Sequence, residues 1–204
     1  MGGKANRASV DEISFRVAGK NHWIHVYSSE KTTLKLLHRK GGKEGLEGLN
    51  IILGYGGEII HGCWASYLSY DHCDHGLCGS HLLRELTFIV DSNQYRWARN
   101  MKKLWTQRGH TVASCAEKCL TDKEYAKLQQ RYRNILTRGG KELPAIPPKP
   151  KGKRGRLAKS DAHNLGERRK KHEALVLLFA NHGCQRCQST GYNSNGFNKT
   201  KYIP

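Results

Sequence analysis

The sequence predicts an α/β protein, in which a mixed sheet comes first and helices follow. Residues 10–17, 23–28 and 32–38 are rich in β-forming residues and are separated by short turns, which predicts an antiparallel meander. The apolar pair 59–60 predicts a further strand. From Gly79 onward the apolar residues recur at helical spacing. With 204 residues, the chain is long enough for one domain of ordinary size plus an extension.

The first strands and turns are predicted from alternation and from turn residues. In residues 10–17 the side chains of Val10 and Glu12 alternate with those of Ile13 and Phe15. The segment 18–21, Ala-Gly-Lys-Asn, is predicted to be a turn, with Gly and Asn suited to positive φ. Residues 43–49 favour a short helix.

The helical part is predicted to build a core rather than a binding platform. Leu82, Leu86 and Ile89 form an apolar stripe, and Trp97 to Trp105 continue it in the same manner. Residues 121–124, Thr-Asp-Lys-Glu, are typical of a helix start. Ser160 and Asp161 favour the start of another helix.

Changes in composition divide the chain. Four of the five prolines and a basic run fall within 143–156, which favours an extended linker. The last residues are rich in Asn, Gly, Ser and Thr without periodicity. We therefore expect a disordered N-terminus (1–9), a sheet-bearing portion (10–92), a helical insertion (93–142), a Pro/basic linker (143–159), a helix (160–180) and a disordered tail (181–204).

The charge balance favours a polyanionic partner. There are 35 Lys and Arg against 17 Asp and Glu, a formal net charge of +18. Neutralising phosphates releases counterions from nucleic acid, so a charge of this size favours DNA. The basic run of the linker is predicted to contact the DNA backbone, although a nuclear-localisation-like signal or a solvated linker remain alternatives. Its cations are Lys149, Lys151, Lys153, Arg154 and Arg156.

Nothing in the sequence indicates secretion or a membrane. The N-terminus lacks the apolar segment of a signal peptide, and no apolar run approaches ~18 residues. We expect a cytoplasmic protein whose seven cysteines are reduced.

Residues 58–86 gather most of the side chains capable of chemistry. Cys73, His75, Cys78 and His81 would be zinc ligands by type, but the usual two-knuckle spacing is missing, and the alternative is a buried Cys78 with a hydrogen-bonded His81. A nucleophilic Cys63 beside a histidine lacks an identifiable orienting group.

Asp11 suggests a different chemistry. A carboxylate on the first strand of a mixed sheet, in a basic protein, suits Mg²⁺ binding for phosphoryl transfer. Such a site needs further carboxylates from distant segments, and the obvious second position is the end of the 59–60 strand. That position is Gly62.

Several ordered motifs resemble the catalytic domain of transposases of the insertion-sequence 66 family. The resemblance covers about residues 8–180. It rests on Val-Asp-Glu-x-Ser-Phe-Arg-Val from residue 10, His-Gly-Cys-Trp-Ala-Ser-Tyr from residue 61, His-Leu-Leu-Arg-Glu-Leu from residue 81, and Gly-Arg-x-Ala-Lys-Ser-Asp-Ala-His-Asn-Leu from residue 155.

The resemblance implies an RNase H-like fold with a helical insertion, and a DDE triad that binds two Mg²⁺ for cleavage of transposon ends and strand transfer. Asp11 matches the family's first Asp and is the one catalytic and metal-binding residue carried over. Gly62 occupies the position of the second Asp. The third acid, a Glu in an Asn-Asn-x-Ala-Glu-Arg block, is absent after residue 180, and the family's N-terminal DNA-binding region is missing.

We therefore expect a truncated, catalytically impaired transposase-derived protein of a mobile element, whose tail comes from a shifted reading frame. Its expected partners are transposon ends and target DNA, with a homo-oligomer or an intact transposase as protein partner. The alternatives are a non-catalytic DNA-binding or regulatory remnant, and a zinc-binding structural module.

Overall fold

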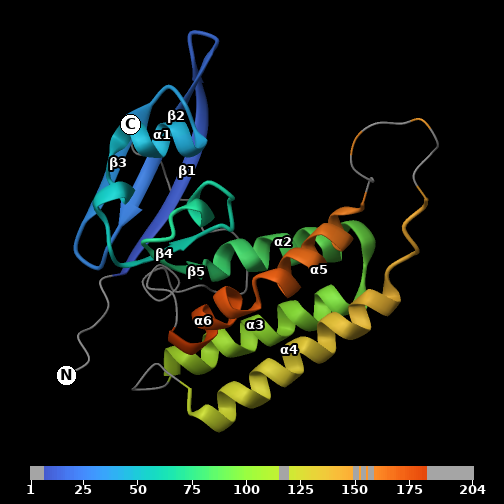
Figure 1. Ribbon diagram of the computed structural model, residues 1–204. Coiled ribbons are helices and arrows are strands. Elements are labelled where there is room, and N and C mark those ends of the chain that lie inside the picture. Colours follow the sequence, from blue (N-terminus) through green and yellow to red (C-terminus); the bar gives the residue numbers. More distant parts are fainter. Residues whose placement is uncertain (1–6, 115–119, 149–151, 153–154, 156–158, 183–204) are drawn as a thin grey trace.

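The computed structural model describes residues 7–114, 120–148, 152, 155 and 159–182, and within them the chain forms a sheet flanked by helices (Figure 1). The sheet has five strands in the order β3-β2-β1-β4-β5. The strands are β1 (Arg7–Val17), β2 (Lys20–Ser28), β3 (Thr33–His38), β4 (Glu58–His61) and β5 (Asp74–Leu77). The helices are α1 (Gly42–Leu49), α2 (Gly79–Asn93), α3 (Arg96–Ser114), α4 (Asp122–Glu142), α5 (Asp161–Lys171) and α6 (Glu173–His182), with short 3-10 turns η1 (Ile52–Gly54) and η2 (Tyr67–Ser69).

The predicted meander is confirmed, with shifted ends. β1, β2 and β3 pair antiparallel, as the sequence predicted, and β4 lies beside β1 and pairs parallel with it. β1 begins at Arg7, inside the segment expected to be disordered, because Arg7 pairs with Glu58 and the two side chains form a 2.5 Å ion pair. The hairpin turn is Ala18-Gly19, both at positive φ, so Asn21 lies in β2 instead of the turn. The four-residue β5 was not predicted.

Helices α2 to α6 gather beside the β5 edge of the sheet, with α6 packed on β5 and α3, whereas α1 lies against β3 (Figure 1). The stretch after residue 93 was predicted to continue one helix, but Gln94 adopts a left-handed conformation (φ 59°) and ends α2. The carboxylate of Glu142 then accepts hydrogen bonds from the backbone N–H groups of Arg96 and Trp97, at 2.6 and 2.9 Å, and so starts α3. No helix in the described residues is long and apolar enough to cross a membrane.

Both predicted helix starts are confirmed, but the last helix is divided. Thr121 and Glu124 form a capping box, and the Ser160 side chain accepts from the backbone N–H of His163. The single helix predicted over 160–180 is two helices, because the conformation at His172 ends α5 before α6 begins.

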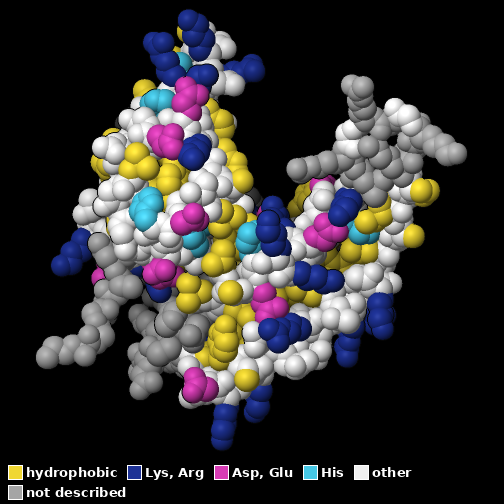
Figure 2. Space-filling view, viewed as in Figure 1, with side chains coloured by type: hydrophobic (Ala, Val, Ile, Leu, Met, Phe, Trp, Pro, Cys, Tyr) yellow, Lys and Arg dark blue, Asp and Glu magenta, His cyan; other side chains and the backbone are white. Residues whose placement is uncertain are grey.

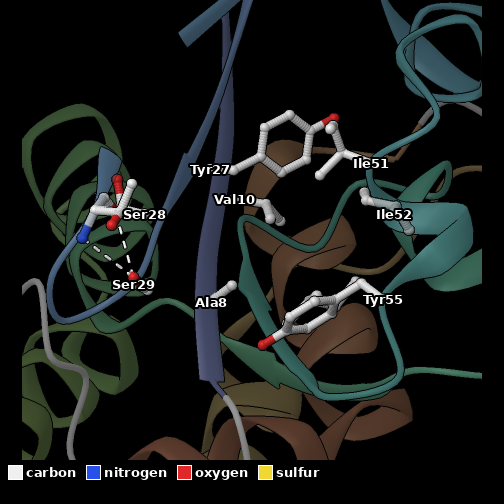
Figure 3. Close-up of a pocket in the computed structure, with 10 residues that line it drawn as sticks. Ala8, Val10, Tyr27, Ser28, Ser29, Ile51, Ile52 and Tyr55 are labelled. Carbon is white, nitrogen blue, oxygen red and sulfur yellow. Dashed lines mark hydrogen bonds between the residues drawn. The ribbon is translucent and has the colours of Figure 1, made fainter. Parts of the chain in front are cut away.

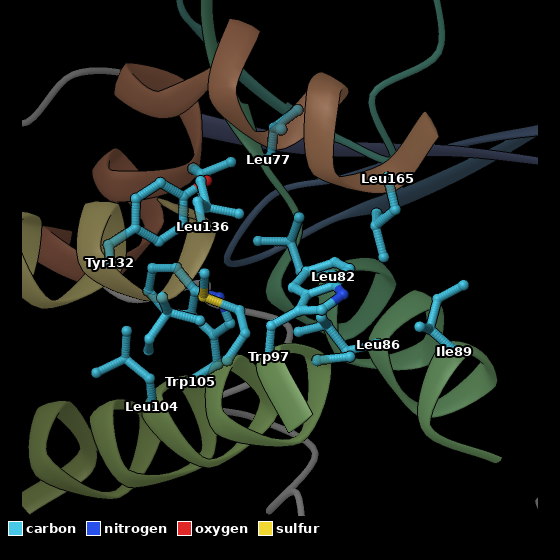
Figure 4. Close-up of a cluster of buried hydrophobic side chains, with 14 of the residues drawn as sticks. Leu77, Leu82, Leu86, Ile89, Trp97, Leu104, Trp105, Tyr132, Leu136 and Leu165 are labelled. Carbon is cyan, nitrogen blue, oxygen red and sulfur yellow. The ribbon is translucent and has the colours of Figure 1, made fainter. Parts of the chain in front are cut away.

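Two apolar clusters stabilise the fold. The larger lies among the helices and contains the predicted stripe, including Leu82, Leu86, Trp97 and Trp105, so these residues are core (Figure 4). The smaller packs one face of the sheet against α1, η1 and η2, and contains Val10, Tyr27, Leu46, Ile52, Ile59, Tyr67, Tyr70 and Cys73.

The other face of the sheet is apolar and exposed near the β1–β2 hairpin. Cross-strand pairing sets Ile13, Ile24 and Leu37 in one row over three strands. Ile13 is 58% exposed and Leu37 is 61% exposed. Since residues alternate between faces, Asp11 lies on this same face, two residues before Ile13.

Candidate active site

Asp11 and Gly62 lie side by side at the centre of the sheet. The parallel pairing of β1 and β4 ends at Ser9 and Ile60. Asp11 lies two residues after Ser9, and Gly62 lies two residues after Ile60. The structure therefore brings together the two positions that the sequence singled out, although one of them has no side chain.

The imidazole of His81 fills the space beside Gly62. His81 comes from the first turn of α2, and its Nε2 lies 3.7 Å from Oδ1 of Asp11. A Cβ atom built on Gly62 would lie 3.0 Å from Cδ2 and 3.2 Å from Nε2 of His81. Such contacts are tighter than ordinary van der Waals contact, so an aspartate at position 62 would require the ring to move.

The charges around His81 favour its protonated form. A hydrogen bond with the Cys78 side chain raises the pKa of His81, and the nearby Asp11 carboxylate adds to this, while burial acts in the opposite direction. Both the His81 and Asp11 side chains remain about one quarter exposed. The arrangement is thus one carboxylate facing one imidazole, with access to solvent.

Glu12 is the acidic residue that the sequence reasoning missed. It lies next to Asp11 on the opposite face of β1, where its carboxylate accepts a hydrogen bond from the Tyr67 hydroxyl. Burial raises the pKa of Glu12 to about 7, and the hydrogen bond from Tyr67 partly offsets this. The available signal was that Asp11 and Glu12 are adjacent in a predicted strand, so that one member of the pair must face the core.

Hydrogen bonds link His61 and His75, two of the histidines in the 58–86 segment. The backbone N–H of Cys63 donates to Nδ1 of His61 at 3.2 Å, so His61 carries its proton on Nε2 and donates to Nδ1 of His75, also at 3.2 Å. Nε2 of His75 then donates to the carbonyl oxygen of Tyr70 at 3.1 Å. Burial lowers the pKa of His61 to about 3, so His61 is neutral, and its hydrogen bond with His75 ties β4 to β5.

These contacts support neither a nucleophilic Cys63 nor a zinc site. Burial raises the pKa of the Cys63 thiol, which opposes thiolate formation. The Cys73 thiol donates to the carbonyl oxygen of Tyr55, away from His75 and His81. Among the described residues, no group of three or more His, Cys, Asp or Glu side chains is placed to hold a metal ion.

The five cations predicted to contact DNA, at positions 149 to 156, lie outside the described residues. On the described part, Lys and Arg side chains are spread over the tip of the β1–β2 hairpin and along the outer side of the helices (Figure 2). The last turn of α5 alone carries Arg168, Arg169, Lys170 and Lys171.

Comparison with known proteins points to one class, the transposases. A family model described as "Transposase IS66 family" matches residues 3–189. The chain belongs to the IS66 transposase family.

Two further comparisons add little. No curated protein matches the chain. A solved structure, the cryo-EM structure of a simian T-cell lymphotropic virus intasome in complex with PP2A regulatory subunit B56 gamma, aligns at 12% identity with a TM-score of 0.29. That alignment covers 76% of this chain and 62% of the other chain.

Proposed function

We propose that this protein is a transposase-derived, RNase H-like domain that binds DNA and has lost the ability to cut and join it. Membership of the IS66 family supports a role in DNA transposition. Three antiparallel strands followed by two parallel ones, in the order β3-β2-β1-β4-β5, are the arrangement expected of the RNase H-like fold that the family resemblance implies.

The observation that carries the loss of activity is that Gly62, instead of a second carboxylate, lies beside Asp11. When bound, two Mg²⁺ ions would stabilise the attacking and leaving oxygens of phosphoryl transfer. Holding them requires several carboxylate oxygens gathered at one point, whereas among the described residues no group of three or more His, Cys, Asp or Glu side chains is placed to hold a metal ion. A hard cation also prefers oxygen to the imidazole nitrogen of His81. The described residues therefore do not fit the two-metal group.

Retention of DNA binding is supported by charge. The excess of 18 positive charges remains whether or not the catalytic residues are present. Backbone contacts of this kind require no particular base sequence. We therefore expect binding that weakens steeply as salt concentration rises.

The test combines binding and cleavage on one substrate. Labelled duplexes that carry the inverted repeats of the surrounding element are incubated with the purified chain, with Mg²⁺ or with EDTA. We expect salt-dependent binding, and no product above that of an Asp11→Ala control. Robust Mg²⁺-dependent cleavage that Asp11→Ala abolishes would overturn the proposal.

A second candidate function is regulation of an intact transposase by competition for DNA or by mixed assembly. The same excess positive charge, without the acids for catalysis, favours it. Adding the chain to a reaction of an intact family member should reduce strand transfer in proportion to the amount added. If excess DNA removes the inhibition, competition for DNA is the cause; if inhibition persists, mixed assembly is.

A further inference from the structure

Two hollows of the molecule differ in the charge of their walls. The hollow between β1, β2 and η1, of about 170 Å³, is lined by ten uncharged residues (Figure 3). The groove between α3 and α4, of about 590 Å³, has Arg108, Lys127 and Arg131 in its walls and Glu124 as its one acid. The Glu124 carboxylate is engaged by Thr121 in the capping box of α4. The groove therefore carries a net positive charge, which suits an anion and not an apolar ligand.

The cations of α4 continue from this groove as a stripe along one face of the helix. Successive members of the stripe are four, four, seven and three residues apart, which places them within about one quarter of the helix circumference. It spans about 27 Å, the axial length of about eight base pairs of duplex DNA. The members of this α4 stripe, all exposed, are Lys123, Lys127, Arg131, Arg138 and Lys141.

The α4 stripe lacks the acidic partners that cations have elsewhere in the chain. Around α1, Lys40 and Lys43 each have a glutamate four residues later, at 3.9 and 3.7 Å. On α4, the residues four positions after Lys123 and Lys127 are cations instead, and such like-charged pairs destabilise a helix. Within the described part of the chain, no member of the stripe forms an ion pair. A polyanion lying along the stripe would relieve this repulsion.

The basic surface extends from α4 onto α3. Gln107 of α3 lines the same groove as Lys127 of α4. Lys103 and Arg96 are exposed and lie on the face of α3 that carries Gln107, four and eleven residues before it. Because the Glu142 carboxylate at the end of α4 caps the start of α3, the two helices run antiparallel, and their cations form neighbouring rows.

The composition of the stripe favours the phosphate backbone of a duplex over other polyanions. It contains no aromatic side chain on which the bases of a single strand could stack. The large apolar side chains of α4, including Leu128 and Tyr132, are buried in the helical core, so the helix has no apolar face to insert into a membrane. Lysine and arginine side chains bind phosphates without reading the base sequence.

We propose that the α4 stripe binds the phosphate backbone of duplex DNA, independently of base sequence, with the cations of α3 beside it. The assignment rests on the proposed DNA-binding function and gives that function a place on the molecule. Since α4 packs on α3 and α5, the DNA contact is separate from Asp11 and His81. Loss of the catalytic carboxylates therefore leaves this surface intact.

Two matched triple variants of the full chain test the assignment. Lys123→Gln/Lys127→Gln/Arg131→Gln removes three charges from the stripe, and glutamine keeps the helix propensity. The control, Lys31→Gln/Lys35→Gln/Arg39→Gln, removes two lysines and one arginine from exposed positions in and around β3. Fluorescence anisotropy with a labelled duplex of about 20 base pairs gives the dissociation constant at several salt concentrations.

The salt dependence of binding reports the number of phosphate contacts. Three lost contacts should make the slope of log K against log[salt] shallower by about 2.7 and weaken binding about a hundredfold at about 0.15 M salt. The control should change the slope by less than about 0.9, the value of one contact. In the unmodified ¹⁵N-labelled chain, the duplex should shift the amides of α4 more than those of β3, a readout that needs no variant.

The outcomes separate this assignment from the proposed function. Equal loss of binding in the two triple variants, or amide shifts away from α4, would overturn the assignment and leave DNA binding itself intact. A failure of the unmodified chain to bind the duplex even at low salt would overturn both. Binding to vesicles of phosphatidylserine and phosphatidylcholine in preference to the duplex, removed by the stripe substitutions, would identify a membrane surface as the partner and overturn the choice of DNA.

Discussion

An aspartate introduced at position 62 should not create a binding site for a divalent cation unless His81 is removed as well. The φ of Gly62 is not positive, so its backbone tolerates an aspartate. The obstacle is the His81 ring, whose Cδ2 lies 3.0 Å from the position of the new Cβ. Overpacking of this kind costs about 1–3 kcal/mol, and because the His81 ring is partly exposed and can tilt, we expect about 1 kcal/mol for Gly62→Asp.

The companion change removes the ring. In Gly62→Asp/His81→Ala the contact is gone, and Asp11 in β1 and the new carboxylate, one residue beyond the end of β4, would face the space that the imidazole leaves. Two such carboxylates suit a divalent cation. With a dissociation constant of about 1 mM, 10 mM Mg²⁺ would stabilise the double variant by about 1.4 kcal/mol, whereas the unmodified protein should gain nothing measurable.

Urea unfolding with and without Mg²⁺ measures both quantities. Gly54→Asp is the matched control, since that glycine is exposed and a Cβ there meets nothing within 4 Å. The reasoning would be refuted if Gly62→Asp cost the same with and without His81, or if Mg²⁺ stabilised the unmodified protein as much as the double variant. Strand transfer should stay absent in every variant, because the third acid of the family is still missing.

Three other changes test separate parts of the structure. Because burial raises the pKa of Glu12 to about 7, the folded protein should lose stability as pH rises from about 4.5 to 7. In Glu12→Gln, the free energy of unfolding should fall by about 1–2 kcal/mol less over this pH range, a figure that allows for solvent screening. Unfolding measured as a function of pH checks this. Arg169 is 2% exposed and donates to a backbone carbonyl of α2, so Arg169→Ala should lower the free energy of unfolding by about 3 kcal/mol. Arg168 forms a more exposed ion pair, so Arg168→Ala should lower it by less than about 1 kcal/mol. Replacing exposed Ile13 and Leu37 by Thr should raise solubility in concentration-dependent light scattering and change stability by less than about 0.5 kcal/mol.

Much of the fold could be predicted because local patterns agreed with the global arrangement. The apolar spacing of α2 and α3 corresponds to the faces of these helices that are buried, whereas alternation located β1 although its apolar face, with Ile13 and Val17, is exposed. The element boundaries that were predicted wrongly depend on contacts between residues that are distant in sequence. The break after α2 depends on Glu142, which is distant in sequence and caps α3, and the early start of β1 depends on the Arg7–Glu58 pair. No local window contains these partners.

The candidate site was predictable in part. Asp11 and Gly62 could be placed side by side from strand order alone, because parallel neighbours end at the same edge. The contact of His81 with Asp11 could not be predicted, although the alternative to a zinc site, a buried Cys78 with a hydrogen-bonded His81, agrees with the hydrogen bond that raises the pKa of His81. What decides its position is the start of α2 after β5, which directs the ring across the end of β4 toward Asp11. A sequence shows that a carboxylate is missing; it does not show what fills the space.

On the proposed loss of activity, Gly62 and His81 together account for the persistence of the fold without a metal site. Carboxylates held close together repel each other unless a cation is bound, so an active site of this kind costs stability when it is empty. Gly62 places no charge next to Asp11, and the raised pKa of His81 favours a compensating positive charge there. Neither residue belongs to the helical core or to the cluster under the sheet. The substitution therefore relieves repulsion at the site without disturbing what holds the chain folded. It follows that, without Mg²⁺, the unmodified protein should have a higher free energy of unfolding than Gly62→Asp/His81→Ala. Adding Mg²⁺ should reduce the difference between these two free energies.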